Sequence, residues 1–134
     1  MDEKPFREER RRSERIDAAF TLSYSVEKPF TLRISLGVAE DIDAIMLNLS
    51  DLGMAIITKY DIPPETQLYL KFNIIDLRLT GEDRRKHMEM TAETVSNVII
   101  PKASHRIGIR FDTISEEDKD AIRNFVKRNK IPSR

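Results

Sequence analysis

The chain contains no cysteine and no tryptophan, and only 4 of its 134 residues are glycine. Without cysteine it forms no disulfide, thiolate metal site or thiol nucleophile, which fits a reducing cytoplasm. These four glycines form neither a Walker loop nor a Gly-x-Gly-x-x-Gly motif. The longest stretch without a charged residue has nine residues, Ala18 to Val26, so we expect neither a membrane span nor a secretory signal.

No charge of one sign predominates, since 23 Lys and Arg residues balance 23 Asp and Glu residues. This balance excludes a generically basic nucleic-acid binder. A chain of this length buries roughly two thirds of its unfolded surface, which is enough for one hydrophobic core. With 6 Phe and 3 Tyr, we expect a core built mainly on Ile, Leu, Val and Met.

The N-terminal segment is the least apolar part of the chain. Residues 1–17 alternate acids and bases, and Arg10, Arg11, Arg12 and Arg15 outnumber the single acid among them, Glu14. Such a segment buries too little apolar surface to fold by itself. We therefore expect a flexible arginine-rich arm over residues 1–17, followed by one folded domain over residues 18–134.

The remainder of the chain predicts strands and one helix. Alternation of apolar and polar residues predicts strands. Ser115 followed by three acids is typical of a helix N-terminus, and the apolar spacing that follows predicts a helix over about 115–129. The fold class is therefore all-β with a C-terminal helix, a six- to seven-stranded antiparallel barrel closed or flanked by that helix. The expected strands cover residues 20–26, 30–36, 45–49, 54–58, 68–74, 88–100 and 106–111, with polar loops at 38–44 and 81–87.

Residues suited to catalysis are scarce. His87 and His105 lie far apart in polar stretches, with no metal-ligand spacing, and we expect both to be solvated. Glu40, Asp41 and Asp43 lack the alternating ligands of a calcium loop and are interpreted as a charged surface loop. We therefore expect no enzyme activity, no metal and no cofactor.

Two short motifs stand out when they are taken together. Arg11 and Arg15 stand four apart in the arm. Asn48 lies near the end of one predicted strand, and Ser50 and Gly53 lie in the turn to the next. Each motif alone is common, since arginine runs are usually solvated and Asn, Ser and Gly favour turns. In this order they resemble the R-x-x-x-R and [D/N]-x-S-x-x-G signatures of the PilZ domain, the bacterial receptor module for cyclic di-GMP.

The resemblance covers nearly the whole chain. Gly108 and Phe111, ahead of the predicted helix, resemble the closing strand of the family. The resemblance implies a PilZ-like split barrel that takes cyclic di-GMP as its ligand and reports to a downstream protein partner. The segment between the motifs is long for the family, and we expect the surplus at Val38 to Ala44. The implied ligand-binding residues are Arg10, Arg11, Arg15, Asn48, Ser50 and Gly53.

The chemistry of these residue types suits such a ligand. An arginine fork bonds phosphate oxygens, pairs with the guanine edge or stacks on the base. In an extended arm, Arg11 and Arg15 lie about 13 Å apart at ~3.3 Å per residue and can reach different parts of one ligand. Asn48 and Ser50 supply small hydrogen-bonding groups, and Gly53 allows a conformation or a close approach that a Cβ would forbid.

Two other functions remain open from the sequence alone. In one, the barrel is a PilZ-like protein-interaction adaptor that does not bind nucleotide. In the other, it is a small β-barrel that binds single-stranded nucleic acid through the arm, a weaker alternative because no exposed aromatic cluster accompanies the arginines. A titration with cyclic di-GMP, GMP and an oligonucleotide separates the three functions.

Overall fold

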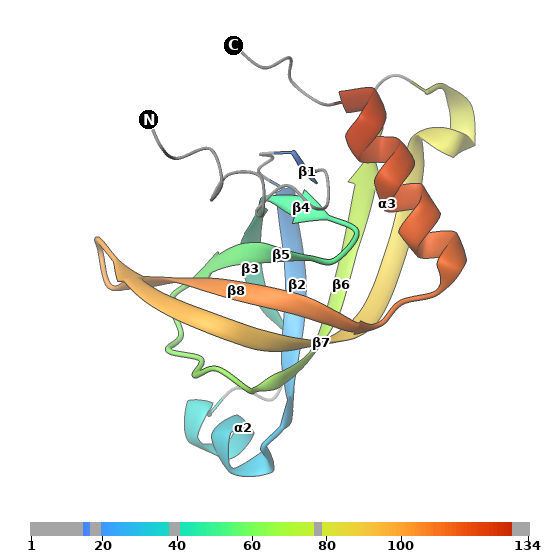
Figure 1. Cartoon of the computed structure of the whole chain (residues 1–134). Coiled ribbons are helices and arrows are strands. Elements are labelled where there is room, and N and C mark those ends of the chain that lie inside the picture. Colours follow the sequence, from blue (N-terminus) through green and yellow to red (C-terminus); the bar gives the residue numbers. More distant parts are fainter. Residues whose placement is uncertain (1–14, 17–19, 38–40, 77–78, 130–134) are drawn as a thin grey trace, which may run out of the picture.

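The computed structural model describes residues 15–16, 20–37, 41–76 and 79–129 (Figure 1). Its centre is a closed antiparallel barrel in the order β2-β3-β5-β8-β7-β6. A second, two-stranded sheet joins β1 (Arg15–Ile16) to β4 (Leu49–Ser50). The barrel strands are β2 (Phe20–Lys28), β3 (Ile42–Leu47), β5 (Gly53–Thr58), β6 (Gln67–Ile75), β7 (Arg85–Ile100) and β8 (Ser104–Thr113).

The barrel interior is filled by the alternating side chains of these strands, as the sequence pattern predicts. Tyr24 is fully buried among them, and its hydroxyl forms a 2.8 Å hydrogen bond with Thr58 Oγ1. Burial raises the pKa of Tyr24 to about 12, although the Thr58 bond opposes the shift. The other large side chains that are completely buried in the strands are mostly aliphatic: Met46, Ile56, Leu68, Leu70, Met88 and Ile107.

The predicted C-terminal helix is present as α3 (Glu116–Asn129). Ser115 caps it, since Ser115 Oγ accepts a 3.1 Å hydrogen bond from the backbone N–H of Asp118. The apolar face of α3 enters the core, and the ring of Phe125 lies 6.0 Å from that of Phe20. The helix therefore flanks the barrel on the side of the β1–β4 pair (Figure 1).

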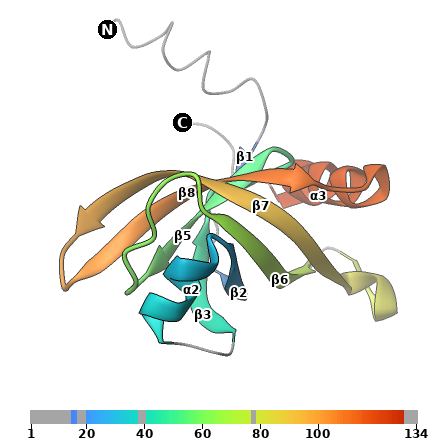
Figure 2. The same ribbon diagram turned by 90° about the horizontal axis from the view of Figure 1, so that it is seen from below.

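The strand predicted at residues 30–36 is wrong, because this segment forms helix α2 (Phe30–Leu36). Four apolar residues at alternate positions fit a strand, but they also place Leu32 and Leu36 one turn apart against the core. Pro29 precedes the helix and Gly37 ends it in the left-handed conformation, at φ 70°. The helix lies next to β2, at the opposite end of the barrel from α3 (Figures 1 and 2).

The two predicted loops are shorter than expected. Residues 42–44 already belong to β3, while residues 38–40 lie outside the described residues. The second loop contains the 3₁₀ turn η1 (Gly81–Arg84), and β7 begins directly after it. Of the predicted arm, only Arg15 and Ile16 are described, as β1.

Candidate functional site

The two sequence motifs meet in the small sheet. Arg15 of β1 pairs with Ser50 of β4, and Ile16 pairs with Leu49. The second arginine of R-x-x-x-R thus lies, at the level of the backbone, directly opposite the serine of the second motif. Arg10 and Arg11 lie outside the described residues.

Asn48 redirects the chain between the two sheets. Its backbone is left-handed, at φ 52°, a conformation that Asn tolerates better than most residues. This kink ends β3 at Leu47 and starts β4 at Leu49, whose side chain is completely buried. Asn48 therefore sets the direction in which the following turn leaves the barrel.

Ser50 holds the turn that follows. Its Oγ accepts a 3.1 Å hydrogen bond from the backbone N–H of Leu52 and lies 3.5 Å from the carbonyl oxygen of Gly53, to which it donates. The residue is 9% exposed, so the hydroxyl is nearly withdrawn from solvent. In the described structure, this hydroxyl satisfies local backbone groups.

Gly53 is required by a close approach. It pairs with Arg110 of β8, and a Cβ on Gly53 would collide with the carbonyl oxygen of Ile109. Its φ does not fall in the left-handed region, where only Gly37 and Gly81 lie among the glycines. Of the two reasons that the sequence offers for this glycine, close approach is therefore the one that applies.

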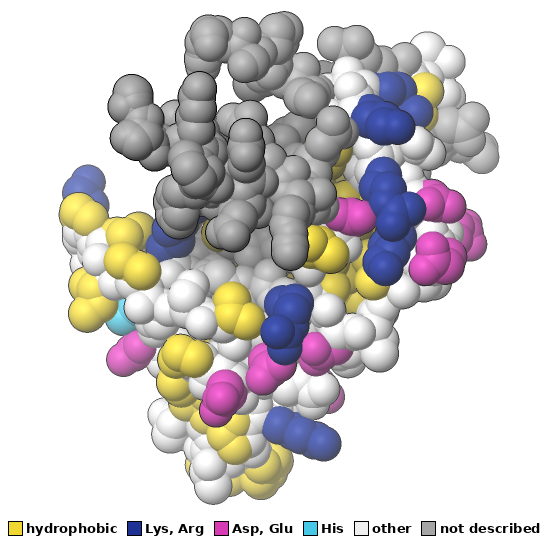
Figure 3. Space-filling model, in the orientation of Figure 1, with side chains coloured by type: hydrophobic (Ala, Val, Ile, Leu, Met, Phe, Trp, Pro, Cys, Tyr) yellow, Lys and Arg dark blue, Asp and Glu magenta, His cyan; other side chains and the backbone are white. Residues whose placement is uncertain are grey.

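A hollow of about 590 Å³ opens beside the turn. Its lining comes from the turn, from the end of β8 and from the start of α3, and it includes two cationic residues, Arg110 and Lys119. Arg110 Nη2 donates a 2.7 Å hydrogen bond to Glu93 across the sheet. Figure 3 shows further Lys and Arg side chains along α3 on the same face of the molecule. The lining also contains two acids, Asp51 and Asp112, so the charges of the hollow itself are balanced.

Asp51 ties the turn to α3. Its carboxylate accepts a 2.8 Å hydrogen bond from Arg123 Nε, and this bond raises the pKa of the Arg123 guanidinium above its ordinary value. Arg123 also donates to Asp120 one turn earlier on the helix, at 2.9 Å. The turn and the middle of α3 are thus joined by an ion pair at the surface.

Comparison with protein-family models identifies the chain. The model of the PilZ domain matches residues 9–128, nearly its whole length. The chain belongs to the PilZ domain family. This family comprises receptor and adaptor domains for cyclic di-GMP.

Solved structures support the fold assignment of this PilZ domain. The inhibitor of motility MotI/DgrA of Bacillus subtilis superposes with a TM-score of 0.65 at 17% identity, over 87% of this chain and 49% of that chain. This chain therefore spans about half the length of that protein. The PilZ domain of YcgR from Escherichia coli, solved with c-di-GMP, gives a TM-score of 0.55 at 16% identity, over 88% of this chain and 89% of that one. No curated protein matches the chain.

Several residues around the site of this PilZ domain were missed by sequence reasoning. Arg110, Lys119 and the pair formed by Asp51 and Arg123 border the motif turn, although they belong to segments far apart in the sequence. Isolated charges on a strand and on a helix give no sign of which turn they will border. Only Asp51, which lies inside the second motif, was within reach of a sequence argument.

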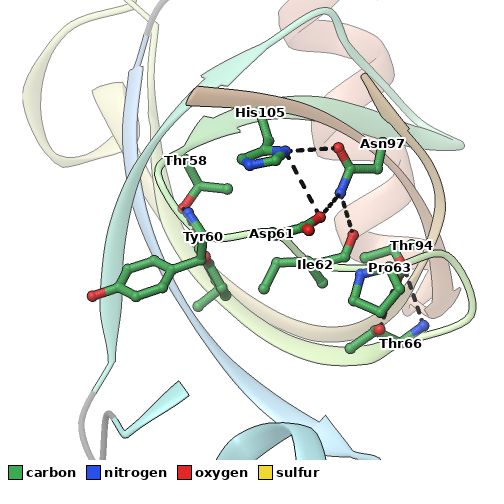
Figure 4. Close-up of polar contacts among 10 residues, drawn as sticks. Thr58, Tyr60, Asp61, Ile62, Pro63, Thr66, Thr94, Asn97 and His105 are labelled. Atoms are coloured by element: carbon green, nitrogen blue, oxygen red, sulfur yellow. Dashed lines mark hydrogen bonds and ion pairs between the residues drawn. The ribbon is translucent and has the colours of Figure 1, made fainter. Parts of the chain in front are cut away.

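The prediction of a solvated His105 is wrong. Its side chain is 13% exposed, and its Nδ1 lies 3.0 Å from Asn97 Oδ1 and 3.8 Å from Asp61 Oδ1. Asn97 in turn donates to Asp61 and to the carbonyl of Ile62, which fastens the loop after β5 to β7 (Figure 4). His87 is exposed, as predicted, and lies 2.8 Å from Glu89.

No described helix has the length and apolar content needed to cross a membrane. The described His, Asp and Glu residues form no group of three with the spacing of a metal site.

Proposed function

We propose that this chain is a cyclic di-GMP receptor, which binds its ligand between the arm residues Arg10, Arg11 and Arg15 and the turn from Asn48 to Gly53. The observation that carries the proposal is the register of the small sheet, in which Arg15 lies opposite Ser50. The E. coli YcgR domain, which shares the fold, was solved with the same ligand. Family membership and the presence of both motifs in the family's order support the assignment.

The arm and the turn have different roles in this proposal. The arginines supply charge-assisted bonds to the two phosphodiester groups and pair with or stack on the guanines. The turn supplies the fixed side of the site, in which Asn48 and Ser50 offer polar groups and Gly53 lets the turn pack directly against β8. Binding energy comes from the arm, while the turn, fixed to β8 and α3, determines where the ligand sits.

The output is a changed protein surface. Ligand phosphates neutralise the clustered arginines and order the arm against the barrel, which creates a surface for a downstream protein partner. In this proposal no bond in the ligand is broken, and the domain has no enzyme activity. It acts as a receptor and adaptor in the cytoplasm.

Titration calorimetry tests the proposal. The intact chain should bind cyclic di-GMP and should not bind GMP or an oligonucleotide with comparable affinity. Arg15→Ala or Arg11→Ala should lose ~2–3 kcal/mol, a roughly 30- to 150-fold weaker binding. Arg15→Lys should restore little of the affinity that Arg15→Ala loses, since a lysine ammonium group lacks the planar guanidinium that forms two parallel hydrogen bonds. Arg33→Ala, on the distant α2, is the matched control and should bind normally.

A second function is favoured by one observation. The Ser50 hydroxyl is engaged by Leu52 and Gly53, which suits an adaptor whose motif residues serve only the turn. Ser50→Ala separates the two functions. Because the hydroxyl accepts the Leu52 N–H in either case, Ser50→Ala should lower the melting temperature in both. In a receptor it also weakens ligand binding, whereas an adaptor has no cyclic di-GMP binding to lose. Preferred binding of the oligonucleotide would instead indicate a nucleic-acid-binding barrel.

A further inference from the structure

The β7–β8 hairpin projects beyond the barrel and ends in an apolar tip. Val95, Val98 and Ile99 are 50%, 55% and 76% exposed, which places them among the most exposed large apolar side chains of the described residues. Figure 3 shows hydrophobic side chains gathered at this end of the hairpin. Exposed apolar clusters of this kind mark surfaces that meet another protein or a membrane.

Both faces of the tip are exposed. Val98 and Ile99 are consecutive residues in a strand, so their side chains point to opposite faces of the hairpin. Across the ladder, Val98 pairs with Arg106 and Ile99 with His105. A protein partner with a flat surface would cover only one of these faces. A lipid layer into which the tip inserts would cover both faces.

The charge around the tip is net positive. Residues 95–106 contain Lys102 and Arg106 and no acid. Lys59 lies at the same end, because the residue before it, Thr58, pairs with His105. One acid also borders the tip, since the exposed Asp61 carboxylate lies against Asn97 and His105 (Figure 4). An apolar tip with a cationic border is complementary to an anionic lipid surface, to which each basic residue adds attraction.

We propose that residues 95–106, the hairpin tip, dock this domain onto the surface of an anionic membrane. Val98, Ile99 and Pro101 enter the headgroup region, and Lys102 contacts the lipid phosphates. The contact is peripheral and reversible. It involves none of the residues assigned to cyclic di-GMP, so it does not depend on the proposed receptor function.

Co-sedimentation with vesicles tests this proposal without cyclic di-GMP. The full chain should bind vesicles of phosphatidylcholine mixed with phosphatidylglycerol, and much more weakly vesicles of phosphatidylcholine alone. The double variant Val98→Ser/Ile99→Ser should bind at least about tenfold more weakly. Lys102→Ala should bind about fivefold more weakly, and added salt should reduce this difference. These exposed substitutions should leave the melting temperature nearly unchanged, which a thermal scan verifies.

The matched control is Phe30→Ser/Ile34→Ser on α2, where both residues are 63% exposed and Glu27 and Lys28 give charges of both signs nearby. It should bind vesicles like the wild type. Equal losses of vesicle binding in both double variants would overturn the proposal in favour of nonspecific hydrophobic adsorption. A wild-type chain that stays in the supernatant with both kinds of vesicle would overturn it outright. In that case, self-association that Val98→Ser/Ile99→Ser abolishes would assign the tip to contacts between copies.

Discussion

At the scale of single residues, two glycines of this chain are needed for different reasons, and the difference can be measured. Gly53 has no strained φ, but a Cβ there meets the backbone of β8. Gly37 has a φ of 70°, but nothing lies within 4 Å of an added Cβ. The first glycine is fixed by packing and the second by its own conformation.

We predict that Gly53→Ala destabilises the fold more than Gly37→Ala. The strained φ at Gly37 costs about 1 kcal/mol, whereas the collision at Gly53 forces two paired strands apart and costs about 2–3 kcal/mol. Urea unfolding of the two variants measures both free energies. Equal losses would mean that β5 and β8 separate easily at this point.

The buried Tyr24 predicts how stability depends on alkaline pH. Its folded pKa of about 12 lies above the ordinary value of 10.0, so the folded chain holds the phenol proton longer than the unfolded chain does. The resulting stabilisation is fully present below pH 10 and is lost as the pH rises towards 12, by about 2–3 kcal/mol in total. Tyr24→Phe lacks this titration. The free energy of unfolding of the wild type should therefore fall more steeply than that of Tyr24→Phe across this range; parallel curves in urea titrations would contradict the assignment.

At the scale of elements, α3 is fastened at its C-terminal end by a buried carboxylate. The side chain of Asp76, directly after β6, is 4% exposed and accepts hydrogen bonds from Arg128 Nε at 2.7 Å and from Asn129 Nδ2 at 3.1 Å. A buried carboxylate that loses a charged donor keeps its desolvation cost without the compensating bond.

Arg128→Ala should therefore lower the free energy of unfolding by about 2 kcal/mol, since Asn129 remains as a donor. The adjacent Lys127→Ala, at an exposed position, should change it by less than about 0.5 kcal/mol. Urea unfolding followed by circular dichroism compares the two. Similar, small effects in both variants would show that the apolar face of α3 is sufficient to hold the helix.

The elements also show what the sequence could and could not predict. Strands with one face in the core, such as β6, and the amphipathic α3 follow from periodicity alone. Helix α2 does not, because apolar residues at every second position satisfy both a strand and two helical faces. The β1–β4 pair is equally hidden, since two residues on each side carry no periodic signal and the pairing joins segments far apart in the chain.

At the scale of the whole molecule, one part of the candidate site could be predicted from the sequence and another part could not. The motif residues Asn48, Ser50 and Gly53 could be selected by type and spacing, because a kink, a turn and a close approach each favour a particular small residue. The residues of β8 and α3 that surround this turn could not be predicted. Arg110 and Arg123 reach the turn only because the barrel closes and α3 folds back over the β1–β4 pair.

This arrangement links the proposed ligand site to α3. Leu49 is completely buried in the same core cluster as Ile122 and Phe125, and Asp51 is bonded to Arg123. A ligand that fixes the turn should therefore restrain the middle of the helix as well. The ion pair is the contact that can be removed without disturbing the core.

Amide hydrogen exchange tests this link. Without ligand, residues 8–14 should exchange rapidly, because clustered arginines repel one another and the segment buries little. Saturating cyclic di-GMP should slow exchange at residues 8–17 and 48–53, by up to about 100-fold when the ligand stands at 100 times its dissociation constant. It should also slow exchange in α3 around Arg123. Asp51→Asn should keep the protection of the turn and lose that of the helix. Strong protection of residues 8–14 in the ligand-free chain would contradict ordering by the ligand and indicate a preformed site; unchanged helix protection in Asp51→Asn would assign the coupling to Leu49 and the core instead.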